Sequence, residues 1–170
     1  GDPDILRDLR FSDGAIGAGL AALQRGADAL CDIQMVSHGI SKRYLSGQVH
    51  CFLNAPEVAE RARQTGETRS MAAMAEWPAR LAGSIVAIGN APTALFRLLD
   101  LLDEGAPSPA LIIGMPVGFI NAAESKQALW DIAPTEFRTP CITLLGRRGG
   151  STFAPATLNA LARMANGIRF

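Results

Sequence analysis

The stretch Ala110-Leu-Ile-Ile-Gly-Met-Pro-Val-Gly-Phe-Ile-Asn-Ala-Ala-Glu-Ser-Lys-Gln-Ala-Leu129 carries the pattern that decides the fold. It begins with a short apolar run, continues through a loop with two glycines and a proline, and ends in a segment of Ala, Glu, Lys and Gln. This order is typical of a strand, a loop and a helix N-terminus, the unit with which α/β proteins present free backbone N–H groups to ligands. Residues 84–93 and 141–151 repeat the pattern. Three such junctions in one chain predict a shared binding edge.

Length and composition predict a single soluble domain over residues 1–170. A chain of 170 residues is long enough to bury about two thirds of its unfolded surface. Although 48% of the residues are apolar, no segment approaches the roughly 20 unbroken apolar residues of a membrane span. The 16 basic and 16 acidic side chains give a net charge of zero, so neither nucleic acid nor an anionic membrane is indicated as a partner. The sequence shows no secretory signal, which predicts a cytoplasmic protein.

The three cysteines predict neither a metal site nor a redox centre. Cys31, Cys51 and Cys141 lie far apart, each inside an apolar run. No CxxC pair is present, and no group of Cys and His has the spacing of metal ligands. We therefore expect buried free thiols in a reducing compartment.

Strands and helices are predicted to alternate along the chain. Apolar runs predict five strands, at residues 29–35, 49–53, 84–88, 110–113 and 141–145. Helices are predicted from residue 12 or 13 to 25 and over 57–64, 68–81, 92–102, 121–132 and 155–165, with a short turn at 41–45. Five strands separated by helices favour a flavodoxin-like doubly wound, mainly parallel five-stranded sheet with helices on both faces. Right-handed crossovers then place every strand-to-helix loop at the carboxyl edge of the sheet.

Five loops are expected to meet at that carboxyl edge. They cover residues 36–41, 54–56, 89–93, 114–118 and 146–151. Together they contain small residues, free N–H groups, two arginines, one histidine and several hydroxyl or amide side chains. This set suits the binding of a polyanion, and it lacks a conspicuous nucleophile with its base.

Two of these loops hold the polar candidates His38, Asn90 and Thr93. A single loop histidine is more often a structural hydrogen bonder, but the position of His38 among serines and a glycine also suits a substrate contact. Its ordinary pKa near neutrality fits an acid or a base. Asn90 or Thr93 is expected to cap the following helix by accepting from its first N–H groups.

A further loop, Gly146-Arg-Arg-Gly-Gly-Ser151, resembles a phosphate cradle. It matches neither GxxxxGK[ST] nor GxGxxG, so its value as a nucleotide signature is weak. A tight turn with solvated arginines is the alternative interpretation.

Ser125, Lys126 and Arg69 are candidates on predicted helices. Ser125 and Lys126 fall on first turns, where the Lys126 ammonium opposes the helix dipole and favours a nearby anion; a solvated helix face is the alternative. Arg69 follows a helix start and has no obvious partner one turn away. Either it pairs with Glu67 or Glu76, or it captures the carboxylate of a ligand.

These motifs together match a known family. They are Gly66-Glu-Thr-Arg-Ser70, Val86-Ala-Ile-Gly-Asn-Ala-Pro-Thr-Ala-Leu-Phe96, Gly114-Met-Pro-Val-Gly-Phe119 with Ala122-Ala-Glu-Ser-Lys126, and Gly146-Arg-Arg-Gly-Gly-Ser151. Cys31-Asp32, Met35-Val36 and His38-Gly39 also fit. With them the chain resembles the precorrin-8X methylmutases, the isomerases of cobalamin biosynthesis. The resemblance runs in order over essentially all 170 residues.

The resemblance implies a flavodoxin-like fold and a homodimer whose active sites lie near the subunit interface. It also implies a reaction without a cofactor, in which one methyl group of the corrinoid migrates to the neighbouring ring carbon. Precorrin-8X then gives hydrogenobyrinate, or the cobalt-containing counterpart. Because the shift is intramolecular, the enzyme supplies rigid positioning and a proton donor to a ring nitrogen, and no nucleophile. The acetate and propionate arms account for the Arg, Lys, hydroxyl and N–H groups.

The resemblance also assigns roles to residues. Substrate contacts fall on His38, Ser41, Arg69, Asn90, Thr93, Ser125 and Lys126. The family's catalytic histidine belongs to a segment expected just upstream of Gly1, so no catalytic residue is expected in residues 1–170. We therefore expect that the chain lacks the family's N-terminal segment and by itself has little or no isomerase activity.

Two other functions stay open at this point. A non-catalytic corrinoid-binding module would use the same edge without a proton donor, and it would bind the corrinoid without turnover. A nucleotide- or phosphate-binding flavodoxin-like protein would depend on Gly146-Arg-Arg-Gly-Gly-Ser151 instead. Flavin absorbance or thermal stabilisation by nucleotides would identify the second.

Overall fold

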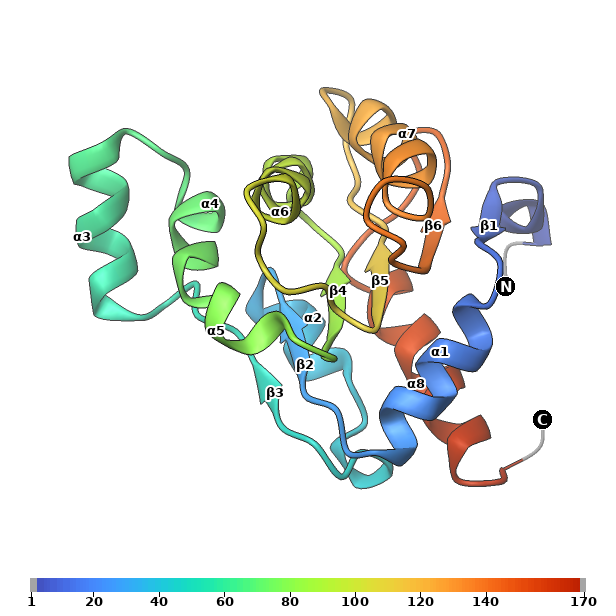
Figure 1. The fold of residues 1–170 in the computed structure, drawn as a ribbon. Coiled ribbons are helices and arrows are strands. Elements are labelled where there is room, and N and C mark those ends of the chain that lie inside the picture. Colours follow the sequence, from blue (N-terminus) through green and yellow to red (C-terminus); the bar gives the residue numbers. More distant parts are fainter. Residues whose placement is uncertain (1–2, 169–170) are drawn as a thin grey trace.

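A six-stranded mixed sheet forms the centre of the computed structural model, which describes residues 3–168 (Figure 1). Its strands are β1 (Leu9–Phe11), β2 (Ala29–Cys31), β3 (Val49–His50), β4 (Ile85–Ile88), β5 (Leu111–Gly114) and β6 (Cys141–Leu144). They lie in the order β1-β6-β5-β4-β2-β3. All neighbouring pairs are parallel except β1 with β6, which are antiparallel. The strand order reverses between β2 and β4, and such a switch point is where open α/β sheets bind their ligands.

Helices cover both faces of this sheet (Figure 1). One face carries α1 (Ala15–Gln24), α2 (Gln34–Gly39) and α8 (Phe153–Ala165). The other carries α5 (Pro78–Leu81), α6 (Pro92–Asp103) and α7 (Ala122–Ile132), while α3 (Pro56–Thr65) packs on α4 (Arg69–Ala73) farther out. Short 3₁₀ helices occupy Pro3–Arg7, Lys42–Tyr44 and Met74–Glu76. Across residues 3–168, none of the helices has the length and apolar character needed to cross a bilayer.

The central strands divide the core into two halves. In β4, Ile85 and Ala87 pack toward α1 and α8, whereas Val86 and Ile88 pack toward α6 and α7. All four side chains are fully buried. Because successive side chains of a strand point to opposite faces, a strand buried on both faces reads as a continuous apolar run. The predicted α/β fold with helices on both faces is therefore confirmed.

The prediction of five strands was wrong, because β1 adds a sixth, antiparallel strand beside β6. Leu9 pairs with Leu144, and Phe11 pairs with Ile142. Ser12, one of the two residues at which the first helix was expected to begin, instead continues this pairing: its N–H donates to the Cys141 carbonyl at 2.9 Å, and its Oγ accepts from the Cys141 N–H at 2.8 Å. The hydroxyl is therefore not available to α1.

Several predicted element boundaries also differ from the structure, and the strand expected over residues 49–53 ends at His50. The strand expected over residues 29–35 ends at Cys31, and α2 occupies much of the expected loop at 36–41. The single helix expected over 68–81 is divided into α4, a 3₁₀ turn and α5. Pro78 has no N–H to donate back along the chain, so it begins α5 instead of continuing the preceding turn.

Candidate functional site

The loops that follow β4, β5 and β6 meet at the carboxyl edge of the sheet. The N–H of Met115 donates to the Ile88 carbonyl at 2.8 Å, and the N–H of Gly150 donates to the Met115 carbonyl at 2.8 Å. The N–H of Gly118 reaches the Arg147 carbonyl at 3.5 Å. Backbone contacts thus join the three junctions that the sequence predicted to share one edge.

Gly149 is required where two of these loops cross. A Cβ atom at this position would collide with the carbonyl oxygens of Met115 and Pro116. Gly149→Ala is therefore expected to displace a loop and to lower the free energy of unfolding by about 1–3 kcal/mol. In the control Gly17→Ala, nothing lies within 4 Å of the new Cβ atom on α1, so stability should rise by roughly 0.5–1 kcal/mol. Urea denaturation measures both; equal stabilities would contradict the close approach.

Asp32, directly after β2, organises the loop that leads into α6. Its carboxylate accepts N–H groups from Gly89 at 3.1 Å, Asn90 at 2.8 Å and Ala91 at 3.0 Å. Burial raises the pKa of this carboxyl, and the three N–H donors act in the opposite direction. Asp32 therefore fixes the backbone at the switch point between β2 and β4.

The expected capping role of Asn90 or Thr93 was wrong. The N-cap residue of α6 is Ala91, and no side chain in α6 or its flank bonds the helix start in the usual capping geometry. Asp32 instead accepts the N–H groups of the three residues that precede the helix. Asn90 is exposed and Thr93 half-buried, so both side chains remain at the surface of the edge.

His38 and Ser41 lie at the C-terminal end of α2. His38 is exposed in the last turn of the helix, and it makes no hydrogen bond or ion pair with the part of the chain that the structure describes. Asn159 of α8 holds this end in place. Its amide accepts the Ser41 N–H at 2.8 Å and donates to the Gly39 carbonyl at 2.8 Å. The other histidine, His50, lies 3.0 Å from the Asp28 carboxylate through its Nε2 atom, a contact within the fold.

Arg69 begins α4 and reaches toward the loop that follows β3. Its Nη2 donates to the Leu53 carbonyl at 3.0 Å and lies 3.5 Å from Asn54 Oδ1. The Thr68 hydroxyl caps α4 and lies 3.5 Å from the Thr93 hydroxyl at the start of α6. Arg69 and Thr93 thus belong to one polar cluster, in which Arg69 is still exposed.

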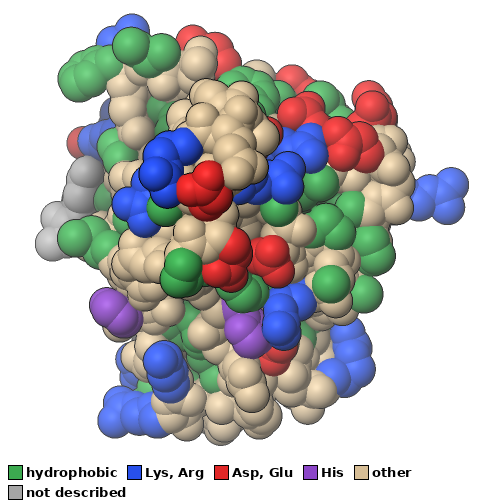
Figure 2. All heavy atoms as spheres, turned by 90° about the vertical axis from the view of Figure 1, so that its left-hand side faces the viewer, with side chains coloured by type: hydrophobic (Ala, Val, Ile, Leu, Met, Phe, Trp, Pro, Cys, Tyr) green, Lys and Arg blue, Asp and Glu red, His purple; other side chains and the backbone are tan. Residues whose placement is uncertain are grey.

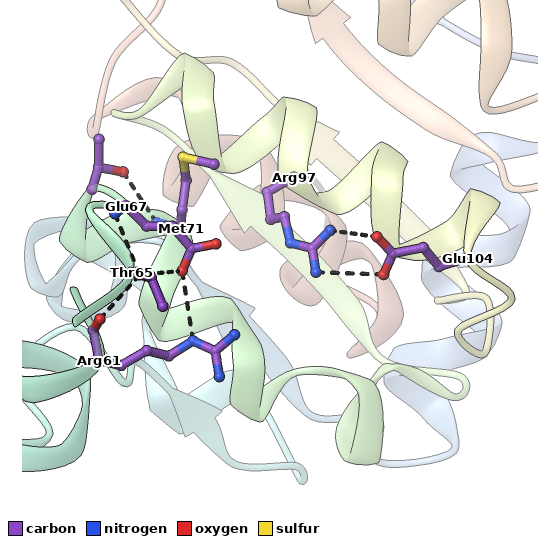
Figure 3. Close-up of polar contacts among 7 residues, drawn as sticks. Arg61, Thr65, Glu67, Met71, Arg97 and Glu104 are labelled. Atoms are coloured by element: carbon purple, nitrogen blue, oxygen red, sulfur yellow. Dashed lines mark hydrogen bonds and ion pairs between the residues drawn. The ribbon is translucent and has the colours of Figure 1, made fainter. Parts of the chain in front are cut away.

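Glu67 is not the partner of Arg69. It binds Arg61 at 3.6 Å and Thr65 at 3.1 Å, which closes the turn between α3 and α4 (Figure 3). The alternative in which Arg69 pairs with Glu67 was therefore wrong.

A separate ion pair joins Arg97 of α6 to Glu104 at 2.8 Å (Figure 3). On the face that carries α3, acidic and basic side chains are intermixed, and neither sign of charge dominates (Figure 2).

Ser125 and Lys126 are buried, which differs from the solvated helix face considered for them. The Ser125 hydroxyl donates to the Ala122 carbonyl at 3.2 Å, within its own helix. Lys126 Nζ donates to the Arg148 carbonyl, and this hydrogen bond ties the loop after β6 to α7. Desolvation lowers the pKa of Lys126 to about 8, and the charge of Asp8 opposes that shift.

An apolar tip on the loop before α7 was not predicted as part of the site. Phe119 is 87% exposed and Ile120 is 79% exposed. The Arg147 guanidinium lies 5.9 Å from the centroid of the Phe119 ring. Two consecutive large apolar residues inside a glycine-containing loop were the available signal. Phe119 and Ile120 thus give this edge an exposed apolar surface, with the Arg147 guanidinium beside the Phe119 ring.

Comparisons with known proteins identify the family. The family model for precorrin-8X methylmutase matches residues 1–164. The chain belongs to this family. It is 52% identical to the precorrin-8X methylmutase of Pseudomonas aeruginosa over 161 residues, which cover 94% of this chain and 76% of that protein. It is 39% identical to the cobalt-precorrin-8 methylmutase of Priestia megaterium, over 97% of this chain and 72% of that protein.

A solved structure agrees with this assignment. The precorrin-8X methylmutase of Thermus thermophilus superposes with a TM-score of 0.84 at 40% identity, over 96% of this chain and 79% of that one. The histidine that the resemblance places just upstream of Gly1 lies outside the described residues 3–168. Within that range, no group of three or more His, Cys, Asp or Glu side chains is arranged to hold a metal ion.

Proposed function

We propose that this chain forms the corrinoid-binding body of an isomerase that converts precorrin-8X to hydrogenobyrinate by moving one methyl group to the neighbouring ring carbon. The observation that carries the proposal is the family match over residues 1–164, together with 52% identity to a relative named for this reaction. The parallel strands follow the order β3-β2-β4-β5-β6, the order of flavodoxin-like sheets. This order supports placing the substrate at the switch point between β2 and β4.

The exposed side chains at this edge suit a flat polycarboxylate. Arg69 and Thr93 offer donors for carboxylate arms on one side, and His38 offers an imidazole at the end of α2. The apolar Phe119 ring, with Arg147 beside it, offers a surface for the macrocycle. Because the methyl group leaves and rejoins the same molecule, these groups need to hold the ring rigidly and to protonate it once.

The proposed substrate contacts divide into two kinds. We propose that the exposed His38, Asn90 and Arg69 and the half-buried Thr93 touch the ligand directly, together with Ser41 just after the end of α2. Ser125 and Lys126 are buried: Lys126 supports the loop after β6, and Ser125 bonds within α7. We further propose a cytoplasmic homodimer with its active sites near the interface, as the family resemblance implies.

Sequence identity to the named relatives favours the cobalt-free substrate. The precorrin-8X methylmutases of Pseudomonas aeruginosa and a Sinorhizobium species share 52% and 48% of aligned residues with this chain. The cobalt-precorrin-8 methylmutases of Priestia megaterium and Salmonella typhimurium share 39% and 40%. We therefore propose precorrin-8X over its cobalt-containing counterpart.

Two measurements test the proposal. Calorimetric titration with hydrogenobyrinate tests binding by residues 1–170. Turnover of precorrin-8X is followed by chromatography, because an isomerisation leaves the mass unchanged, for residues 1–170 and for the same chain extended at Gly1 by a family member's histidine-bearing segment. We expect binding in both proteins and conversion chiefly in the extended one. Binding without conversion in either would favour a non-catalytic corrinoid-binding module.

Arg69→Ala is expected to weaken hydrogenobyrinate binding by about tenfold, the effect of losing one charge-assisted hydrogen bond to a carboxylate. Arg69→Lys should recover part of the affinity, because it keeps the charge but not the planar donors. Arg63→Ala is the matched control, since Arg63 is exposed on α3 and pairs with Glu60. Calorimetry measures all three. An unchanged dissociation constant for Arg69→Ala would contradict a direct contact.

A further inference from the structure

A cavity lies at the opposite edge of the sheet from the proposed corrinoid site. It has a volume of about 650 Å³, within the range of small-molecule sites. Its lining comes from the end of β1, the last turns of α7 and the loop that enters β6. Phe11 and Pro140 stand at the amino edge of β6, whereas the glycine loops follow its carboxyl end. The two sites therefore share no lining residue.

Aromatic and proline side chains form much of the wall of this cavity. Phe11 is 44% exposed toward the solvent, and Trp130 is half-buried on α7. Pro134 and Pro140 are the other apolar residues of the lining. Aromatic rings contribute large contact areas with few rotatable bonds, so a flat ligand would lose little of its binding energy to ordering these side chains.

Two opposite charges line the cavity without pairing. Asp13 and Arg138 are both exposed, and neither has a hydrogen bond or an ion pair to any residue in the described range 3–168. The other acidic lining residue, Asp131, is already engaged, because the Gln127 side-chain N–H contacts both of its carboxylate oxygens at 3.0 Å. One carboxylate and one guanidinium are thus left for a ligand.

Arg138 is held in an unusual backbone conformation. Its φ of 50° lies in the left-handed region, which costs a residue with a Cβ atom about 1–2 kcal/mol. The next residue anchors this conformation: the Thr139 N–H donates to the Ala133 carbonyl at 2.8 Å, and its hydroxyl donates to the Phe137 carbonyl at 3.2 Å. A buried Thr139 therefore fixes the backbone from which Arg138 extends at the cavity rim.

We propose that this cavity binds a small zwitterion with an aromatic body, of the chemical class of the aromatic amino acids. Arg138 binds the carboxylate, Asp13 binds the ammonium group, and the ring packs against Trp130 and Phe11. Each charge of the ligand meets one unpaired charge of the opposite sign, which a simple anion or a simple amine does not achieve. This site is independent of the isomerase activity, since it uses none of the residues at the carboxyl edge.

Nuclear magnetic resonance of the ¹⁵N-labelled protein tests this site with L-phenylalanine as the probe. The indole N–H of Trp130 should shift saturably with a dissociation constant of about 1 mM or tighter, while that of the buried Trp77 stays in place. 3-Phenylpropionate lacks the ammonium group and phenethylamine lacks the carboxylate. Each should bind about fivefold more weakly, the upper range for one exposed ion pair.

Matched variants complete the test. Arg138→Ala should weaken L-phenylalanine binding about fivefold and remove its advantage over phenethylamine, and Asp13→Asn should remove its advantage over 3-phenylpropionate. Arg147→Ala, which alters a cation at the other edge, should leave binding unchanged. The site is refuted if Trp130 shows no saturable shift. The zwitterion assignment is also overturned if all three probes bind equally well. The same holds if Arg147→Ala weakens L-phenylalanine binding as much as Arg138→Ala does.

Discussion

Replacing Asp32 with alanine is expected to lower the free energy of unfolding by about 3 kcal/mol. The carboxylate accepts three backbone N–H groups, and those of Gly89 and Ala91 belong to buried residues. A buried donor left without an acceptor costs about 1–3 kcal/mol. The N–H of Asn90 belongs to an exposed residue, so water can replace its partner. Two lost buried bonds therefore account for the expected effect.

Urea denaturation of two variants and one control measures this effect. Asp32→Asn keeps the shape of the side chain but turns one acceptor into a donor, so its loss should fall between wild type and Asp32→Ala. Asp103→Ala is the control, because Asp103 is exposed in the last turn of α6 and its change should stay within about 0.5 kcal/mol. A loss below 1 kcal/mol in Asp32→Ala would show that the loop does not depend on this carboxylate.

The same variant should affect the proposed site. Asp32 holds the turn that precedes α6, and Asn90 and Thr93 extend from that turn and the first residues of the helix. If the turn loosens, the donors lose their fixed positions, and hydrogenobyrinate binding should weaken along with stability. Arg69→Ala, by contrast, should weaken binding alone. Comparing the two separates a residue that positions the site from one that contacts the ligand.

Much of the fold could be predicted from the sequence because its strands are buried on both faces. Residues 84–88 and 110–113 are short apolar runs, and each is followed by a glycine loop and a helix. β1 was not predictable in this way, since Leu9-Arg10-Phe11 has three residues and a charge at its centre. Its pairing depends on β6 and Ser12, which are far apart in sequence. Local patterns do not contain that information.

The meeting of the glycine loops could be predicted, but the contacts of individual side chains at the candidate site could not. Convergence of the glycine loops follows from the right-handed crossovers of parallel strands. The role of Asp32 depends on donors 57 to 59 residues away, so no local motif reveals it. The one sequence signal was an acidic residue directly after a fully buried strand. Lys126 was correctly predicted to lie on a helix. The contact of its side chain could not be predicted, because its partner is the carbonyl of Arg148, 22 residues later.

Lys126→Met is expected to change how stability depends on pH. The pKa of Lys126 is about 8 in the fold and 10.5 in an unfolded chain, because burial disfavours the ammonium ion. Below pH 8 both states carry the proton, and the fold bears the full cost of the buried charge. Between these pH values the unfolded chain binds more protons, so the stability contributed at this position rises with pH. The rise is on the order of 3 kcal/mol at most.

The difference between wild type and Lys126→Met isolates this effect. Burial raises the pKa of Cys141 to about 11, and it also raises those of Cys31 and Cys51, so the thiols lower stability as pH increases. They act equally in both proteins and cancel in the difference. Lys42→Met is the matched control, because Lys42 is the other lysine of the chain and is exposed.

Lys126→Met should also separate stability from binding at pH 7. Removing a buried ammonium and keeping a side chain of similar length leaves the fold as stable or more stable, because the desolvation cost disappears. The Arg148 carbonyl then loses its donor, and the loop of residues 146–151 is no longer held from below. Hydrogenobyrinate binding should therefore weaken while the free energy of unfolding stays equal or rises. If both fall together, Lys126 serves the core and not the loop; if the difference curve is flat from pH 8 to 10.5, its ammonium is not buried in the fold.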